Sequence, residues 1–295
     1  MHLFTERKMR LLHIYSCRGM GLKTIDKMFA HDPTFKEVYN MSKNDLKFYY
    51  QMNEKQADVF HQDLNKSIDE LFRTEHGSFQ FITRLDKEYP HQLRHIFDPP
   101  WILFYKGDLS LLHKEKSLAV VGTRYPTKQA LPIMKQILYP LIRNDWCIVS
   151  GLAYGIDALS HQLALNENGS TIAVLGSGLQ SIYPKEHKKL AETIANNGLL
   201  LSEFLPLQPP AKWQFPLRNR IISGLTRGTL VVEAKEKSGS LITADQALEQ
   251  GREVFAIPGS VLNPNSKGTN NLIQQGAKMV LCSQDIENEL FIEKN

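Results

Sequence analysis

The stretch EFLPLQPPAKWQFPLRNRIISGLTRGTLVVEAKEKSGSLITADQALEQGREVFAIPGS at residues 203–260 decides the fold of this chain. Its apolar runs at 229–234 and 254–257 indicate two strands, and a Ser-Gly-Ser turn followed by an amphipathic helix separates them. Strand, glycine turn, helix and strand in this order form the βαβ unit of a parallel sheet. Ligands of such sheets bind where the carboxyl ends of strands meet the N-termini of helices.

A basic loop precedes this unit. No Asp or Glu occurs at residues 205–227, whereas four cations do: Lys212, Arg218, Arg220 and Arg227. Trp213 and Phe215 lie between the first two, and aromatic rings beside cations suit single-stranded nucleic acid because the rings stack on bases. At least one of these rings is expected to anchor the loop to the core instead. The loop predicts an anionic ligand such as a phosphate chain.

Strands and helices alternate regularly from residue 118 onward. Further apolar runs of strand length occur at 118–121, 147–149, 171–175, 199–202 and 279–281. Helices are expected between them, including one at 218–225 directly after the basic loop. This alternation predicts an α/β fold with a doubly wound parallel sheet. Strand-like segments at 79–83 and 101–105 indicate an elaboration at the edge of this sheet.

The turns that follow three of these strands are rich in glycine. They offer backbone amides at helix N-termini, where the helix dipole favours anions, and the candidate contacts are Gly122, Ser150, Gly151, Gly176 and Gly178. No G-x-G-x-x-G or Walker pattern is present, which argues against a dinucleotide or a triphosphate. Arg124 in the first turn suits a phosphate or a salt bridge to a neighbouring helix. Lys185, Lys188 and Lys189 taken alone suit a solvated helix face.

Residues 1–75 predict a small all-α domain, and residues 76–295 predict the sheet domain. Short helices on either side of Gly19-Met20-Gly21 fit a helix-hairpin-helix, in which glycine amides approach a phosphate. A tight turn in a helical bundle fits this segment equally well. A second helical pair follows, with breaks near Ser42 and Asn53.

Composition and charge set limits on the function. The net charge of +4 over 295 residues is mild, and the three cysteines are far apart, so neither a disulfide framework nor a local zinc site is indicated. No apolar run has the length of a membrane span, and the N-terminus lacks a cleavage-site pattern. We expect a soluble cytoplasmic protein with no cofactor or metal and no membrane partner.

Four ionisable residues could support catalysis. Asp157 and His161 are four residues apart near a glycine turn, where they form either an acid/base pair or a helix cap with a packing contact. Glu203 and Glu233 each follow a strand, and they could support hydrolysis or hold Arg218 and Arg220 in place. The sequence contains no activated nucleophile, metal set or base–orienter chain around them. We therefore expect no enzymatic activity and assign no catalytic residue.

Several long motifs resemble the DNA-processing protein A family, DprA or Smf. The matching stretches are VVGTRYPT at 120–127, SGLAYGIDALSH at 150–161, AVLGSGLQSIYP at 173–184, LSEF at 201–204, FPLRNRIISGL at 215–225, VVEAKEKSGSLITADQALEQGR at 231–252, FAIPGS at 255–260 and SKGTNNLIQQGA at 266–277. The resemblance implies an extended Rossmann-like domain preceded by a small helix-hairpin-helix or SAM-like domain. It also implies a homodimer that binds and protects single-stranded DNA and loads RecA recombinase during natural transformation, without catalysis.

The resemblance assigns roles to particular residues. It implies DNA binding at Arg124, Lys185 and Lys212, with Arg218 and Arg220 beside them. It implies a dimer interface at Asn270, Ile273 and Met279, with RecA contacts near Leu248 and Glu253. The chain departs from the family pattern in carrying Gln180 where an Asp is usual, and in ending without the C-terminal winged-helix domain that many members have.

Two other functions compete with this one. Nucleotide phosphoribohydrolases of the lysine-decarboxylase-like type share the sheet architecture but carry a Pro-Gly-Gly-x-Gly-Thr-x-x-Glu turn. The comparable turn here, residues 237–243, lacks the glycine pair and the Glu three residues after Thr243. A pure interaction scaffold is the second alternative, and the concentration of basic residues at one sheet edge argues against it.

Overall fold

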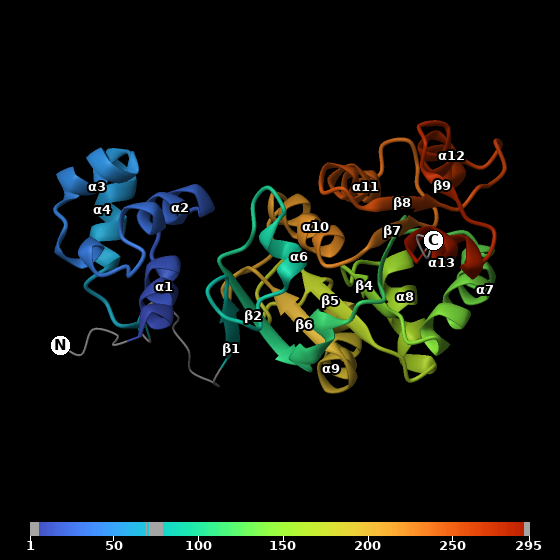
Figure 1. The fold of residues 1–295 in the computed structure, drawn as a ribbon, viewed down its shortest axis with the longest axis horizontal. Helices are drawn as coiled ribbons and strands as arrows, with labels where there is room; N and C mark the ends of the chain where they lie inside the picture. The colour runs from blue at the N-terminus through green and yellow to red at the C-terminus, as the bar shows by residue number, and fades with distance from the viewer. Residues whose placement is uncertain (1–5, 69, 71–78, 292–295) are drawn as a thin grey trace. The chain divides into compact units, whose positions relative to one another are not determined.

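The computed structural model describes residues 6–68, 70 and 79–291, and the chain divides into two compact units. The helical unit comprises Met1–Lys87 with Pro100–Leu103, and the sheet unit comprises Glu88–Pro99 with Phe104–Asn295. Figure 1 shows the helices of the helical unit in blue and most of the sheet unit from green to red. The boundary that we predicted between residues 75 and 76 lies outside the described residues.

The helical unit contains short amphipathic helices. They are α1 (Arg7–Ser16), α2 (Leu22–His31), the 3-10 turn η1 (Glu37–Asn40), α3 (Lys43–Tyr50) and α4 (Glu54–Asp63). The predicted breaks at Ser42 and Asn53 are confirmed, since both residues are N-caps that form capping boxes with the third helical residue. The apolar faces of these helices bury Leu11, Leu12, Ile14, Ile25, Met28, Leu46 and Phe60. Strand β1 (Gln80–Thr83) also belongs to this unit.

The sheet is mostly parallel, as predicted. Its strands are β2 (Ile102–Gly107), β3 (Ser117–Val121), β4 (Cys147–Ser150), β5 (Thr171–Leu175), β6 (Leu199–Ser202), β7 (Gly228–Val231), β8 (Glu253–Ala256) and β9 (Lys278–Met279). The order is β1-β2-β6-β5-β4-β3-β7-β8-β9, with β2 antiparallel to β6 and every pair from β6 to β9 parallel. The central strands are buried along their whole length, which explains their continuous apolar sequences.

Helices cover the sheet. They are α6 (His91–Arg94), α7 (Ala130–Arg143), α8 (Ile156–Asn166), α9 (Lys188–Asn197), α10 (Gln214–Gly224), α11 (Gly239–Glu249), α12 (Lys267–Gln274) and α13 (Ser283–Leu290). Short 3-10 turns connect them: η2 (Leu109–His113), η3 (Lys185–His187) and η4 (Pro264–Ser266). Helices α7, α8 and α13 pack around Trp146 in one core cluster, and α9 packs in another cluster with β5 and β6.

Helix α10 begins four residues earlier than the sequence predicted. It starts at Gln214 rather than Arg218, although Pro216 lies in its first turn. The first amides of a helix have no intrahelical acceptor, so a proline at that position loses no hydrogen bond. Consequently Phe215 lies on the same helix as Arg218 and Arg220 rather than on the preceding loop.

The sheet reverses its winding between β3 and β7. The chain proceeds from β3 to β4 and β5 on one side, whereas it proceeds from β7 to β8 and β9 on the other. At the carboxyl ends of these two strands, the amide of Thr123 donates to the carbonyl oxygen of Glu233 at 2.7 Å. Ligands of open parallel sheets bind in the crevice at such a switch point.

Candidate nucleic-acid interface

A cleft of about 590 Å³ opens at this switch point. The turn after β3, the first half of α10 and the start of α11 supply most of its lining. Four cations line it: Arg124, Lys212, Arg218 and Lys235. Three aromatic side chains join them: Tyr125, Tyr183 and Phe215. The lining includes a single carboxylate, Asp157, among the residues that the structure describes. The cleft is therefore suited to an anion that carries aromatic groups.

The cations at the rim are free to bind an external anion. Arg124, Lys212 and Lys235 are exposed, and none of their side chains forms a hydrogen bond or ion pair with any residue in the described part of the chain. The salt bridge that we considered for Arg124 is therefore absent among these residues. A phosphate bound here would displace no internal partner.

Arg218 forms the floor of the cleft. Its Nη1 donates to the carbonyl oxygens of Gly151 and Val174, and its guanidinium carbon lies 6.0 Å from the centre of the Phe215 ring. A Cβ on Gly151 would lie only 2.4 Å from Nη1, so glycine is needed there to admit the arginine. Burial lowers the pKa of Arg218 to about 10. Arg218 joins the ends of β4 and β5 and remains charged at neutral pH.

Asp157 and His161 hold the structure around this arginine. The Asp157 carboxylate accepts a hydrogen bond from the Gly151 amide at 3.1 Å, and burial raises the pKa of this carboxyl. His161 Nδ1 lies 2.7 Å from the Thr171 hydroxyl, and burial lowers the pKa of His161 to about 3. Each side chain is engaged with a neighbouring element, which favours the cap-and-packing interpretation over an acid/base pair.

The two glutamates that follow strands have different partners. Glu203 accepts a hydrogen bond from Arg220 Nη2 at 2.7 Å in a buried ion pair, as one of our interpretations expected. Glu233 does not hold Arg218: it accepts from the amide and hydroxyl of Thr127 and from Asn265. Arg220 is absent from the residues that line the cleft. We therefore regard Arg220 as a structural residue rather than a surface available to DNA.

The glycine-rich turns approach protein atoms closely. A Cβ on Gly178 would lie 2.0 Å from the carbonyl oxygen of Leu205, and one on Gly176 would lie 2.7 Å from the Phe215 ring. The predicted backbone contacts therefore have packing roles of their own. Five residues of these turns were predicted as backbone contacts, and only Gly122 among them lines the cleft. Gly151 contacts Arg218 beneath the cleft, and the Ser150 hydroxyl donates to the Val120 carbonyl oxygen.

The remaining predicted contacts lie near the same opening. Lys185 is exposed and follows the cleft residue Tyr183 by two positions, and its side chain forms no hydrogen bond or ion pair with any described residue. The Tyr183 and Phe215 rings lie 5.8 Å apart. Trp213 packs edge-on against Phe204 at 5.8 Å while remaining more than half exposed, so it both anchors the loop and presents a surface.

Some residues that line the cleft were not predicted from the sequence. Lys235 lies in the turn that follows β7, as Arg124 lies in the turn that follows β3, so the same strand-end rule would have found it. Tyr125 is 80% exposed. Its position next to Arg124 in the sequence, an aromatic residue beside a cation, could have identified it as a binding residue.

The predicted partner-binding residues lie toward the far edge of the sheet. Asn270 exchanges two hydrogen bonds with the backbone of Gly259, and Ile273 lies half-buried on the same helix, α12. Met279 is half exposed on β9, the last strand of the sheet. Leu248 and Glu253 are exposed at the end of α11 and the start of β8.

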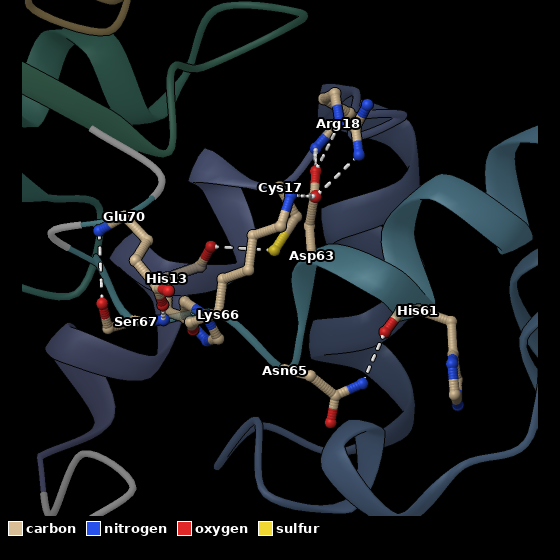
Figure 2. A network of polar contacts seen from close by, with 9 residues as sticks. All are labelled: His13, Cys17, Arg18, His61, Asp63, Asn65, Lys66, Ser67 and Glu70. Carbon is tan, nitrogen blue, oxygen red and sulfur yellow. Dashed lines mark hydrogen bonds and ion pairs between the residues drawn. The ribbon is translucent and has the colours of Figure 1, made fainter. Parts of the chain in front are cut away.

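The hairpin of the helical unit differs from the cleft. Arg18 donates to Asp63 from its backbone amide at 3.0 Å, from Nε at 2.8 Å and from Nη2 at 2.9 Å, and Lys66 Nζ adds a fourth contact at 2.6 Å (Figure 2). These hydrogen bonds from Arg18 hold the pKa of the buried Asp63 carboxyl well below its usual range. The arginine next to the glycine turn is thus engaged by an internal carboxylate, which favours the tight-turn interpretation.

Two further features are absent from the described residues. No group of three His, Cys, Asp or Glu side chains among them is arranged to hold a metal ion. Within the same residues, no helix combines the length and apolar character needed to cross a membrane.

The fold and the cleft define a Rossmann-like protein with cationic side chains around its switch point. The chain belongs to the family described as DNA recombination-mediator protein A, whose model matches residues 80–291. It is 52% identical to the DNA processing protein DprA of Bacillus subtilis over 204 residues, which cover 69% of each chain. It is 50% identical to the Streptococcus pneumoniae DprA over 212 residues, which cover 72% of this chain and 74% of the relative.

Solved structures agree with this assignment. The X-ray structure of DNA processing protein A from Streptococcus pneumoniae superposes with a TM-score of 0.85 at 40% identity, covering 96% of this chain and 98% of that one. DNA processing protein A from Helicobacter pylori superposes with a TM-score of 0.64 at 34% identity, covering 72% of this chain and 96% of that one.

Proposed function

We propose that the cleft binds single-stranded DNA and that the protein acts as a recombination mediator. The observation that carries this proposal is the gathering of exposed, unpaired cations with the Tyr183–Phe215 ring pair in one cleft. The Helicobacter pylori relative is described by its single-stranded DNA binding mode, which supports the same ligand class.

The residues of the cleft have three proposed roles: binding phosphates, stacking on bases and positioning the floor of the cleft. Arg124, Lys212 and Lys235 neutralise backbone phosphates, with Lys185 extending the track. Tyr183 and Phe215 stack on bases, a contact worth about 1–3 kcal/mol per base and tolerant of sequence. Arg218 keeps its hydrogen bonds to the carbonyl oxygens of Gly151 and Val174, and it positions the floor of the cleft beneath the phosphate-binding and stacking side chains. Recognition of this kind depends strongly on salt and shows little base preference.

Fluorescence anisotropy with labelled single- and double-stranded oligonucleotides tests the proposal. We expect the wild-type protein to prefer the single strand, and Lys212→Ala to weaken that binding. Arg143→Ala is the matched control, because this exposed arginine pairs with Glu167 outside the cleft. A preference for duplex, or an equal loss in the control, would contradict the assignment of the cleft.

The proposal includes a homodimer and RecA recombinase as partners. Met279 and Ile273 supply apolar surface near the β9 edge, and Leu248 supplies an exposed apolar contact beside Glu253. Sedimentation of Met279→Asp should show a shift toward monomer, with Phe97→Asp, at an exposed aromatic elsewhere, as control. Leu248→Asp should weaken capture by immobilised RecA while leaving DNA binding unchanged. The opposite pattern in either experiment would reject that interface.

We assign no catalytic step to the cleft. Asp157 is buried against Gly151 and Arg218, and His161 is engaged with Thr171, so neither is poised to transfer a proton to a bound ligand. Incubation with nucleoside monophosphates should release no free base. Base release that Arg124→Ala abolishes would revive the phosphoribohydrolase alternative.

A further inference from the structure

Two histidines face each other outside the cleft, one at the start of helix α6 and one at its C-cap. His91 and His95 are four residues apart and both are exposed. Their Nε2 atoms lie 3.2 Å apart, and their ring centres lie 4.5 Å apart with an interplanar angle of 57°. Neither residue lines the DNA cleft, so the proposed function makes no use of them.

The separation of the two nitrogens matches that of ligands on one metal ion. Imidazole nitrogens bind Zn²⁺ at about 2.0–2.1 Å, and two such ligands on a tetrahedral ion are about 3.3 Å apart. Histidines four apart on one helix turn are the spacing by which helical sites chelate a metal. Two neutral imidazoles can share only one hydrogen bond, whereas a metal ion engages both lone pairs.

The segment between the histidines is fixed by packing. Leu93 is fully buried, and a Cβ on Gly224 of α10 would lie 2.8 Å from its Cδ2, so α6 sits directly against α10. Arg252 Nη2 donates to the carbonyl oxygens of Gln92 and Gly224, which ties the same turn to α10. The pair therefore loses little backbone freedom when it binds a ligand.

We infer that His91 and His95 form a two-imidazole site for a divalent transition-metal ion of the Ni²⁺, Cu²⁺ and Zn²⁺ group. Imidazole suits these ions, and affinity for such ligands peaks at Cu²⁺. The two side chains occupy two coordination positions, and water or a donor from another molecule completes the shell. Within the described residues no third His, Cys, Asp or Glu joins the pair, so the ion is exchangeable rather than permanently held.

Titration calorimetry of the full-length, untagged chain with CuCl₂ and with NiCl₂ tests this inference. We expect one site per chain, and His91→Ala or His95→Ala each to weaken binding by at least about tenfold, because chelation is lost. His113→Ala is the matched control, since this exposed histidine on η2 forms no such pair with another described histidine.

A second readout separates ligation from misfolding. The visible absorption band of bound Cu²⁺ should shift to longer wavelength in either single variant, because one nitrogen ligand is replaced by water. Circular dichroism and single-stranded DNA binding of the variants should remain those of the wild type. Equal metal affinity in wild type, His91→Ala and His95→Ala would overturn the inference, as would equal loss in His113→Ala.

Discussion

The hairpin hinge of the helical unit and the cleft of the sheet unit combine the same elements with opposite outcomes. Both place an arginine beside a glycine turn, and the sequence suggested a phosphate at each. At the hinge, Arg18 donates three hydrogen bonds to the buried carboxylate of Asp63. At the cleft, Arg124 and Lys212 have no partner among the described residues.

The hinge and the cleft differ in whether a carboxylate lies within hydrogen-bonding distance of the arginine side chain. Asp63 is 45 residues from Arg18 along the chain, so local sequence gives no sign of the pairing. A cation engaged in this way must break its internal bonds before it can bind a phosphate, whereas a free cation need not. We therefore expect nucleic acid to bind where cations are available rather than wherever a motif contains one.

The largest effect is expected from the floor of the cleft. Arg218→Met removes the bonds to Gly151 and Val174 and leaves the Asp157 carboxylate buried without its neighbouring charge. Removing one partner from such a buried arrangement costs about 3–5 kcal/mol. Hydrogen exchange of peptides that span β4 and β5 should reveal this loss. Arg124→Met, at the exposed rim, should leave the same peptides unchanged, and equal protection in both variants would contradict the positioning role.

At the hinge, Asp63→Asn should destabilise the helical unit by about 2–3 kcal/mol. Hydrogen bonds to a charged group contribute roughly that much, and this carboxylate accepts from both Arg18 and Lys66. Hydrogen exchange should rise in peptides from α1 and α4 and stay unchanged in the sheet unit. Unchanged exchange in α1 and α4 would show that the internal carboxylate does not close the hinge.

Acid should weaken the helical unit through Asp32. Burial raises the pKa of Asp32, but hydrogen bonds from Thr34, Lys36 and Glu37 outweigh it and lower the pKa to about 2. Because the folded pKa is depressed, the stabilisation is complete above the unfolded value of 3.8 and is lost as pH falls toward 2. The loss should reach about 2 kcal/mol.

Urea unfolding at pH 5, 4 and 3, followed by Trp101 fluorescence, measures this effect. Trp101 belongs to the helical unit, and replacing Trp146 and Trp213 by Phe removes the other two tryptophan signals. Asp32→Asn should flatten the dependence on pH. A wild-type midpoint that does not move between pH 5 and pH 3 would contradict the role of this carboxylate.

The fold was largely predictable from the sequence. Buried parallel strands are continuous apolar runs, and the strands at 171–175 and 199–202 have the predicted bounds. The start of α10 was missed because Pro216 suggested a loop, whereas a proline in the first turn is compatible with a helix.

The site was predictable only in part. The strand-end rule predicted Arg124 and Lys212 at one edge of the sheet, and both line one cleft, where the carboxyl ends of parallel strands meet. The ion pair of Arg220 with Glu203 was one of two open interpretations, and the bonds of Glu233 to Thr127 were not foreseen. Such pairings depend on which buried side chains of different helices and strands face each other. Residue spacing in the sequence does not predict this.

A comparison of Arg124→Ala with Arg18→Ala shows whether single-stranded DNA binds at the cleft or at the hairpin. Binding of a labelled single strand is followed by anisotropy over a salt series. We predict that Arg124→Ala weakens binding about tenfold and reduces the slope of log K against log salt by about 0.7, the value of one phosphate contact on a single strand. Arg18→Ala should leave affinity and slope unchanged. Equal losses in both variants, or a loss in Arg18→Ala alone, would contradict the account.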